Sequence, residues 1–517
     1  MHKNYITLLL VVLCFKVHSQ SAQKSTLIKN ITIITASEEK VMHQVGFVLV
    51  KDSKIAYVGK EKPEILGSYD ELDGKGKFVT PGLIDSHVHL ANTAGFNRQL
   101  QKEYPELVDA YFEQLPRSYL YHGFTTLIDV NNYNPKRINA IGQSPLHPDI
   151  YTCGNQVQVM DDFMMEMEEY PVDVRYQFPF LYDRYNRQIV FPDSIDLASH
   201  TPKRIISGIR NQGGIGVKLA YEDEASGLIV SWAKPGIGII RELVLEAQKY
   251  SMPVLLHAPS LEGHEFGLKT GVQIFAHGLW NWSADPKDYG NTILTGQHKK
   301  VLSQIGQKQS GYQLTFRAIT GEEDLIENNF GADKHLENVY PKGYLKLLQT
   351  TEGDWGRKKI LGRAEFLKKT NPPFYDAIKS GHVNDEEIWP ALYKIYKTRL
   401  NTVAKFLAEN NANFILGSDT PAMNMFTNPP GYNGFLEMKH MYEAGIPLSS
   451  IFRAATYNNA KAFHLEEEFG SITRGKIANL LILNSDPLLD VDAYNDIDIV
   501  ILQGKIIERT QLSALNY

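Results

Sequence analysis

The sequence predicts an α/β protein in which a parallel α/β domain is combined with a small β-sandwich built from both termini. Short apolar runs separated by turn residues fill residues 26–80 and recur near the C-terminus, as in strands. Between these ends, apolar strand-like runs alternate with helical stretches, the pattern of a parallel sheet with helical crossovers. Several of the central strands end in a polar side chain. A chain of 517 residues is long enough for both parts.

The composition is that of an ordinary folded protein and excludes one class of partner. Hydrophobic residues make up 43% of the chain and charged residues 22%. The formal net charge of -6 gives no basic footprint, so we expect no binding to nucleic acid.

Residues 1–19 have the layout of a secretory signal peptide. A basic residue precedes an apolar run over residues 6–15, and small residues near Ser19 suit cleavage there. The run is too short to cross a bilayer permanently, so we expect an exported protein, periplasmic or secreted, with no stable membrane span after cleavage. Lipidation at Cys14 is the alternative, although the preceding Leu13 is larger than the residue such a site prefers.

The β-sandwich is assigned to residues 20–80 and 465–517, and the α/β domain to residues 81–464. Turn residues such as Asp-Ser and Gly-Lys-Gly separate the terminal strands. The clearest apolar runs of this part are Gly46–Val50, Lys54–Gly59, Asn479–Leu483 and Asp498–Leu502.

The stretch Pro81–Leu90, with the sequence PGLIDSHVHL, begins the α/β domain. It is a short apolar strand that ends in His87 and His89. Residues i and i+2 of a strand point to the same face, so the two imidazoles project together and could share one divalent metal. The alternative for a bare His-x-His is a pair of structural histidines.

The rest of the domain continues the alternation. A helix is expected over Glu106–Tyr121, broken by Pro116, and the long stretches 156–202 and 279–390 are expected to be insertions, the second with helices of its own. Further helices are expected over Ile237–Tyr250 and Ala391–Glu409. The predicted strands are Phe124–Val130, Asp149–Thr152, Gly213–Leu219, Pro253–His257, Gly271–His277, Tyr312–Phe316 and Asn413–Asp419.

PGLIDSHVHL resembles the first barrel strand of the amidohydrolase superfamily, nearest to its imidazolonepropionase-like and prolidase-like branches. Residues 124–130 resemble the family's second strand, GxTTxRD, with Ile128 in place of Arg. Residues 470–480 resemble its closing GxxxxGxxADL motif, with Asn479 in place of Asp. The resemblance implies a (β/α)₈ TIM barrel over residues 81–464, in which all strand ends meet at one catalytic face.

These strand ends supply one candidate set of metal ligands. Imidazole and carboxylate suit zinc, so one or two Zn²⁺ ions are the expected cofactor. Such an ion lowers the pKa of a water to roughly 7, and Asp419 could carry the water's proton to the leaving nitrogen as general acid and base. Taken alone, a strand-end Asp is often only a helix cap. The candidate ligands are His87, His89, Lys218, His257, His277 and Asp419.

Lys218 decides between one ion and two. Bound cations would repel a lysine ammonium, but a buried lysine can lose its proton. The family's two-metal members carry a carboxylated lysine at this strand end, and the resemblance implies that Lys218 bridges two ions. His257 and His277 would then hold the second ion; if the protein resembles the family's mononuclear members, His277 is instead a hydrogen-bonding residue near the carbonyl. The alternative is an ordinary ion pair of Lys218 with Glu222 or Glu224.

Two other residues are candidates for contacting the substrate. Tyr221 lies three residues past Lys218, and Arg317 follows the seventh strand, where it could bind a carboxylate.

The resemblance implies a metal-dependent hydrolase that acts on C–N bonds other than ordinary protein peptide bonds. Its expected partner is a small-molecule substrate: a dipeptide, an N-acyl amino acid or a cyclic amide. A lactone or ester hydrolase of the same fold is one alternative, and a non-catalytic periplasmic binding protein is another. The sequence leaves open whether the chain forms a homo-oligomer. The substrate is not predicted because the two insertions control it.

Overall fold

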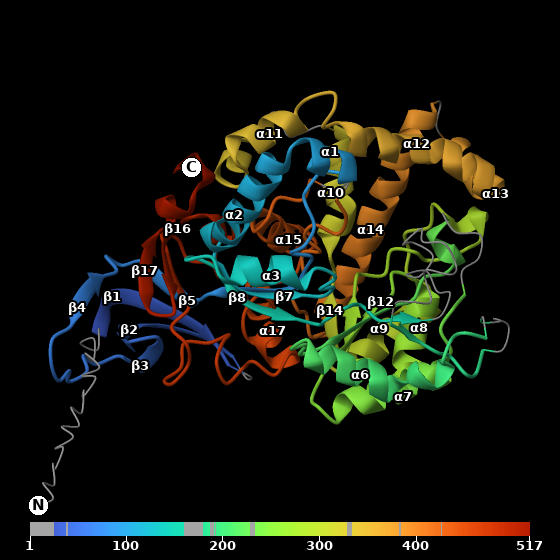
Figure 1. The fold of residues 1–517 in the computed structure, drawn as a ribbon. Helices are drawn as coiled ribbons and strands as arrows, with labels where there is room; N and C mark the ends of the chain where they lie inside the picture. The colour runs from blue at the N-terminus through green and yellow to red at the C-terminus, as the bar shows by residue number, and fades with distance from the viewer. Residues whose placement is uncertain are drawn as a thin grey trace, which may run out of the picture.

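The computed structural model describes residues 25–516 except 38–39, 160–178, 187–190, 192, 228–232, 328–332, 382–383 and 425–426. The predicted signal peptide lies outside the described residues, as does part of the insertion at 156–202. Figure 1 shows a sheet formed by the two ends of the chain beside a larger α/β body, and the predicted α/β class is confirmed. None of the described helices is long and apolar enough to cross a membrane.

The terminal sheet takes strands from both ends of the chain, as predicted. The order across the sheet is β17-β16-β15-β5-β1-β2-β3, and β4 pairs separately with β1. The two ends meet where β15 pairs antiparallel with β5. The strands are β1 (Ser25–Ala36), β2 (Val41–Lys51), β3 (Lys54–Gly59), β4 (Asp70–Asp73), β5 (Phe78–Pro81), β15 (Leu480–Leu483), β16 (Ile497–Leu502) and β17 (Lys505–Glu508).

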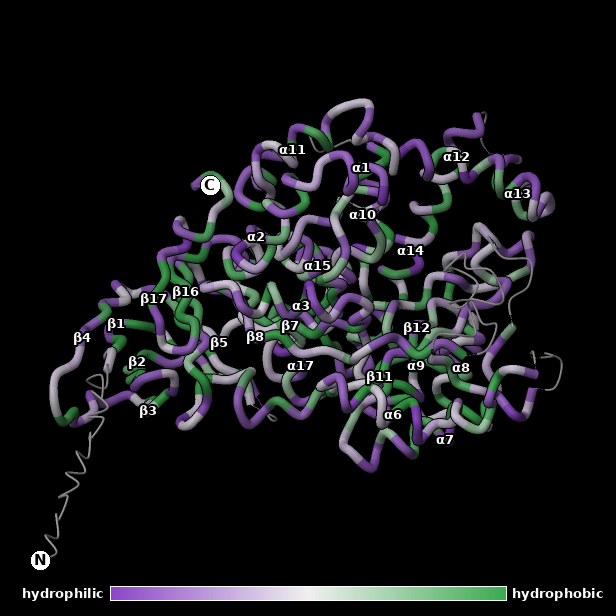
Figure 2. The backbone as a smooth tube through the Cα atoms, viewed as in Figure 1, coloured by the Kyte–Doolittle hydropathy of each residue, from purple (hydrophilic) through white to green (hydrophobic). Residues whose placement is uncertain are grey.

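This sheet bends over a core of its own. A bridge between Lys54 and Ile477 brings the start of β3 to the segment that leads into β15. Alternate side chains, including Ile33, Val48 and Ile501, are buried together inside the bend. Figure 2 shows the hydrophobic colour along β1, β2 and β16.

The departure from the family motif at Asn479 belongs to this terminal part. Its amide nitrogen donates to Asp149 at 2.7 Å, and its side-chain oxygen accepts from the backbone N–H of Gln503 at 2.8 Å. Asn479 therefore ties the sheet to the α/β body, and neither of these partners is a predicted metal ligand.

In the described part of the α/β body, seven parallel strands and residues 413–420, called the bridged segment below, follow one another around a ring. Parallel bridges join Thr152 to Gly214, Tyr312 to Phe414 and Val88 to Thr420, so the order around the ring is the order in the chain. Every neighbouring pair is parallel, and the strands therefore end at the same face. The strands are β6 (Leu83–Val88), β7 (Phe124–Asp129), β8 (Asp149–Thr152), β11 (Val217–Ala220), β12 (Val254–His257), β13 (Ile274–Ala276) and β14 (Gly311–Gln313).

The segment predicted as a strand over Asn413–Asp419 is irregular, and the prediction of a strand there is wrong. Tyr312 donates to Asn413 and Asp419 donates to His87, so the segment bonds both neighbours in the ring. Between these bonds, the N–H of Leu416 turns away and donates to Ala454 at 3.1 Å. This diversion breaks the ladder that a regular strand needs.

Helices connect the strands on the outside of the ring (Figure 1). Local signals set their ends: Ser260 accepts from the N–H of Gly263 at the start of α8, and Gly271, with φ of 84°, ends that helix. The connecting helices are α2 (Pro105–Tyr121), α3 (Pro135–Gly142), α6 (Pro202–Asn211), α7 (Ile237–Gln248), α8 (Leu261–Thr270), α9 (Gly296–Gln307) and α14 (Ile388–Glu409); α15 (Tyr432–Glu443), α16 (Leu448–Ala454) and α17 (Tyr457–Ala462) follow the last segment.

Two predictions about helices have opposite outcomes. The expected break at Pro116 is wrong, because α2 continues through it and the buried proline packs within the body. Proline removes one backbone hydrogen bond, and tertiary packing outweighs that loss here. The prediction that 279–390 holds helices of its own is confirmed by α9, α10 (Phe316–Glu327), α11 (Lys342–Leu348), α12 (Trp355–Thr370) and α13 (Pro372–Lys379).

Candidate metal centre

The predicted ligands come from separate positions of the ring. His87 lies near the end of β6, and His89 follows that strand directly. Since alternate residues share a face, the two rings lie side by side, with centroids 5.5 Å apart. The other four candidates are Lys218 in β11, His257 at the end of β12, His277 just after β13 and Asp419 in the bridged segment.

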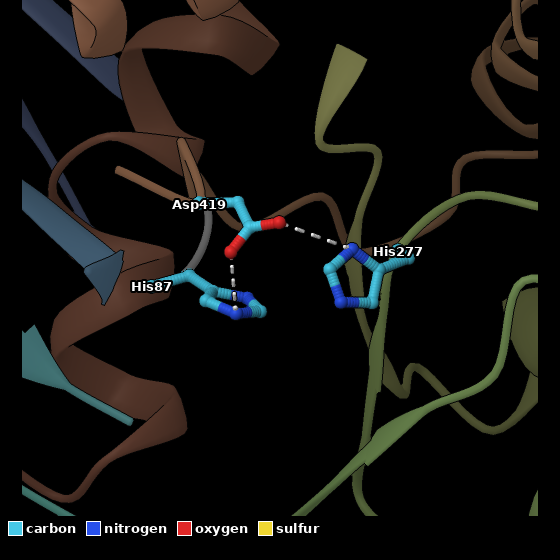
Figure 3. A group of neighbouring side chains, drawn as sticks. All are labelled: His87, His277 and Asp419. Carbon is cyan, nitrogen blue, oxygen red and sulfur yellow. Dashed lines mark ion pairs between the residues drawn. The ribbon is translucent and has the colours of Figure 1, made fainter. Parts of the chain in front are cut away.

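Three of these residues form a compact buried cluster. Potential ligand atoms of His87, His277 and Asp419 all lie within 4.8 Å of one another. Figure 3 shows the Asp419 carboxylate between the two rings, with one oxygen toward each. Oδ1 lies 3.4 Å from Nε2 of His87, and Oδ2 lies 3.9 Å from Nδ1 of His277. His89 joins from the same strand end, with its Nε2 3.0 Å from Oδ1 of Asp419.

The cluster has the protonation states that a metal requires. Burial lowers the pKa of His87 well below its usual value, and nearby Lys218 lowers it further. Burial and the neighbouring His257 do the same for the pKa of His277. Burial raises the pKa of Asp419, but the facing histidines outweigh burial and hold it well below its usual value. Neutral imidazoles beside an ionised carboxylate fit a divalent transition ion such as zinc.

Lys218 points into this cluster and away from the glutamates considered as partners. It is buried, and its Nζ lies 3.2 Å from Nε2 of His87. Burial lowers the pKa of Lys218 to about 8, although Asp419 acts in the opposite direction. Among the described residues, Glu222 contacts His257 at 2.8 Å and Glu224 contacts Lys234 at 2.8 Å, and neither is ion-paired with Lys218.

His257 lies at the edge of the cluster. Its ring centroid is 4.4 Å from that of His277, while its Nε2 faces the carboxylate of Glu222. Burial raises the pKa of Glu222 and the contact with His257 lowers it, with a net rise. His257 is therefore within reach of the cluster, held by an acid that the sequence suggested only as a partner for Lys218.

Three residues of this site have left-handed backbone conformations. His277, Thr315 and Asp419 all have positive φ, at 80°, 47° and 56°. Such angles are uncommon for residues other than glycine, and rarest for a β-branched residue such as Thr. Strained backbone persists only where the surrounding structure enforces it, and it gathers at functional sites.

Four polar residues of the site were not predicted from the sequence. Gln313 and Thr315 contact Nδ1 of two of the ligand histidines, each at 2.9 Å. Asp85 accepts from the hydroxyl of Ser418, and burial raises its pKa to about 7. Asp129 accepts from the N–H of Leu90 at 2.7 Å, and burial raises its pKa to about 6. Gln313 and Asp129 each end a strand, which is the signal that could have found them.

The two candidates for substrate contact bond to other groups. The hydroxyl of Tyr221 donates to Glu262 at 2.6 Å. Arg317 lies buried in α10, where its guanidinium contacts Asn433 at 2.6 Å and Asp324 at 2.7 Å. In the described structure, none of these contacts brings either side chain to the cluster.

The family model of the amidohydrolase family matches residues 78–273 and 391–507. The match covers more than half of the chain, and the protein belongs to this family. The predicted membership in the amidohydrolase superfamily is thereby confirmed, and membership of this family indicates a hydrolase that acts on C–N bonds.

Curated relatives match over short stretches. An adenine deaminase of Clostridium perfringens is 31% identical over 80 residues, which is 16% of this chain and 14% of the relative. An imidazolonepropionase of Brucella anthropi is 39% identical over 71 residues, which is 13% of this chain and 17% of the relative. The alignments thus span less than a fifth of either relative.

Solved structures match over nearly the whole chain. A Xaa-Pro dipeptidase with bound methionine has a TM-score of 0.59 at 18% identity, covering 94% of this chain and 100% of that one. The ochratoxinase of A. niger has a TM-score of 0.61 at 16% identity, covering 94% and 96%. At this identity the likeness shows the fold, and it identifies the α/β body as a TIM-barrel-like domain.

Proposed function

We propose that this protein is an exported, zinc-dependent amidohydrolase that cleaves a C–N amide bond in a small molecule. The observation that carries the proposal is the buried cluster of His87, His277 and Asp419 at the strand ends of an amidohydrolase. A dipeptide, an N-acyl amino acid or a cyclic amide is the proposed substrate class. The presence of a Xaa-Pro dipeptidase among the structures of the same fold supports the dipeptide.

The residues of the cluster have different proposed roles in hydrolysis. When bound, a zinc ion supplies Lewis acidity, which lowers the pKa of a water and polarises a substrate carbonyl. His87, His89 and His277 would hold it through their imidazole nitrogens. Asp419 is ionised and faces all three rings, so its carboxylate can accept the proton of the attacking water. The same group then returns that proton to the leaving nitrogen.

The architecture and the location complete the proposal. We take the ring to be the family's (β/α)₈ barrel and the bent terminal sheet to be its β-sandwich. Export is proposed from the signal-like layout of residues 1–19. Export can be tested by measuring the molecular mass of the chain isolated from outside the cytoplasm. Cleavage after Ser19 should reduce that mass by the mass of residues 1–19.

The proposed function is tested by metal analysis and a substrate screen on the whole protein. We expect one or two transition ions per chain, loss of turnover on chelation and its return with zinc. The screen compares dipeptides, N-acyl amino acids and cyclic amides with lactones and esters. Hydrolysis of lactones or esters alone would replace the amide assignment, and a metal-free protein without turnover would support a binding protein.

Lys218 provides a separate prediction about the number of ions. If it is a carboxylated bridge, the wild type binds two ions per chain and needs bicarbonate for full reconstitution. Lys218→Ala should lower metal content toward one ion and impair turnover, and short carboxylic acids should restore part of both. Lys234→Ala is the matched control, since Lys234 pairs with Glu224 away from the cluster. One ion per chain in both wild type and Lys218→Ala ends the two-metal interpretation.

A further inference from the structure

Gln313, the last residue of β14, makes a specific contact with a proposed metal ligand. The side chain is fully buried. Its Oε1 lies 2.9 Å from Nδ1 of His87, on the opposite side of the imidazole from the atom that faces Asp419. Its Nε2 lies 2.8 Å from Oγ of Ser86, the residue that precedes His87.

The neighbours of Gln313 determine which way its amide points. The hydroxyl of Ser86 donates to the backbone carbonyl of Leu416 at 2.7 Å, so its oxygen is left to accept. The carbonyl of Ser86 is a second acceptor, 3.4 Å from the same amide nitrogen. Two acceptors on this side require the NH₂ group of Gln313, and its carbonyl oxygen must therefore face His87.

This orientation settles the tautomer of His87. A carbonyl oxygen can only accept a hydrogen bond, so Nδ1 of His87 carries the proton. In a neutral imidazole the other nitrogen then has a free lone pair. That nitrogen, Nε2, is the one that lies 3.4 Å from Asp419 and 3.2 Å from Lys218.

We propose that Gln313 is a positioning residue for metal binding: it holds His87 in the tautomer whose Nε2 is free to ligate and fixes the ring toward Asp419. The inference rests on the proposed function, because it assumes that His87 is a metal ligand. Groups that bond the far nitrogen of a ligating histidine typically strengthen metal binding by 10- to 100-fold.

Gly417 gives independent support, because it makes room for this contact. A Cβ at position 417 would lie 2.7 Å from Cβ of His87 and 2.8 Å from Nε2 of Gln313. The bridged segment thus presses its backbone against both side chains. Thr315, two residues further along, contacts Nδ1 of His277, the nitrogen that lies 3.9 Å from Asp419. Residues 313–315 therefore contact two proposed ligands while contributing none of the predicted ones.

The test measures zinc affinity by competition with a chelator, on full-length variants. Gln313→Met keeps the length of the side chain but cannot accept from Nδ1, and we expect its zinc affinity to fall 10- to 100-fold. Gln313→Glu restores an acceptor for Nδ1 but places its second oxygen against the two acceptors of Ser86, so its zinc affinity should lie between those of Gln313→Met and the wild type. Gln114→Met is the matched control: Gln114 is also buried and donates to a serine hydroxyl, but it lies in α2 and contacts Ser118 and Leu512.

The outcomes separate positioning from packing. Equal zinc affinity in Gln313→Met and the wild type overturns the inference, and so does an equal loss in Gln313→Met and Gln114→Met. If Gln313→Met does not fold, Ser86→Ala serves instead, because it removes the nearer of the two acceptors that orient the amide; unchanged zinc affinity in that variant also overturns the inference. A wild type that binds no zinc overturns the proposed function itself. The comparisons of Gln313→Met with the wild type and with Gln114→Met can overturn the inference about Gln313 without affecting the proposed function.

Discussion

Asp419→Asn is expected to keep bound metal while kcat falls by about 10²-fold or more, the usual scale of general acid–base assistance. The asparagine retains an oxygen that can ligate an ion, in the place of the carboxylate that lies 3.0 Å from Nε2 of His89. It cannot take a proton from the attacking water, because an amide oxygen is far less basic than a carboxylate. Steady-state turnover and metal content measured on the same preparation check both halves of the prediction.

Asp333→Asn is the control for this substitution. Asp333 also faces a histidine, at 2.8 Å from Nδ1 of His335, but this pair is exposed at the surface. Its replacement should leave turnover unchanged. Near-normal kcat in Asp419→Asn would show that another group carries the proton, and loss of metal there would show that Asp419 acts chiefly as a ligand.

Replacing both His87 and His89 with Ala should remove bound metal and abolish turnover. The two rings lie together at the end of β6, and no other imidazole from that strand can replace them. The β6 backbone remains bonded to β7 on one side and to the bridged segment on the other, so the fold should persist. Metal analysis and far-UV circular dichroism on the double variant measure the two effects separately.

A double variant of two exposed histidines controls for the loss of imidazoles as such. His43 pairs with Asp486 on the terminal sheet, and His335 pairs with Asp333 outside the ring. Replacing both with Ala should leave metal and turnover as in the wild type. Full metal occupancy in the variant that lacks His87 and His89 would exclude both of them as ligands.

The alternation of strands and helices, and the polar residues that follow the apolar runs, could be predicted from the sequence because those features are local. His87 and Asp419 each follow an apolar run, so their candidacy as site residues can be inferred without knowing the fold. Gln313 also ends a strand, but an amide is not a metal ligand, and its role depends on Ser86 and His87 far away in the chain. Contacts between residues so far apart in the chain can be identified only from the folded structure.

The errors have the same origin. The segment that ends at Asp419 has the composition of a strand, yet a bond from Leu416 to Ala454 in another element breaks its ladder. Pro116 carries a strong local signal to end a helix, and tertiary packing overrides it. The contacts of Arg317 with Asn433 and Asp324 depend on a neighbouring helix and on its own helix, which its position after a strand does not reveal; its role toward a substrate stays a prediction.

The pairing of β5 with β15 makes the order of synthesis matter. β5 ends at Pro81, and β6, which carries His87, begins at Leu83. On a ribosome, the partner of β5 is among the last strands to emerge, and contacts between such distant parts of a chain form slowly. Until then β5 has an open edge, and open edges invite pairing with other chains. A nascent chain that stops before residue 480 would therefore contain all the predicted metal ligands. It would still lack β15, the strand that pairs with β5 just before the strand that carries His87.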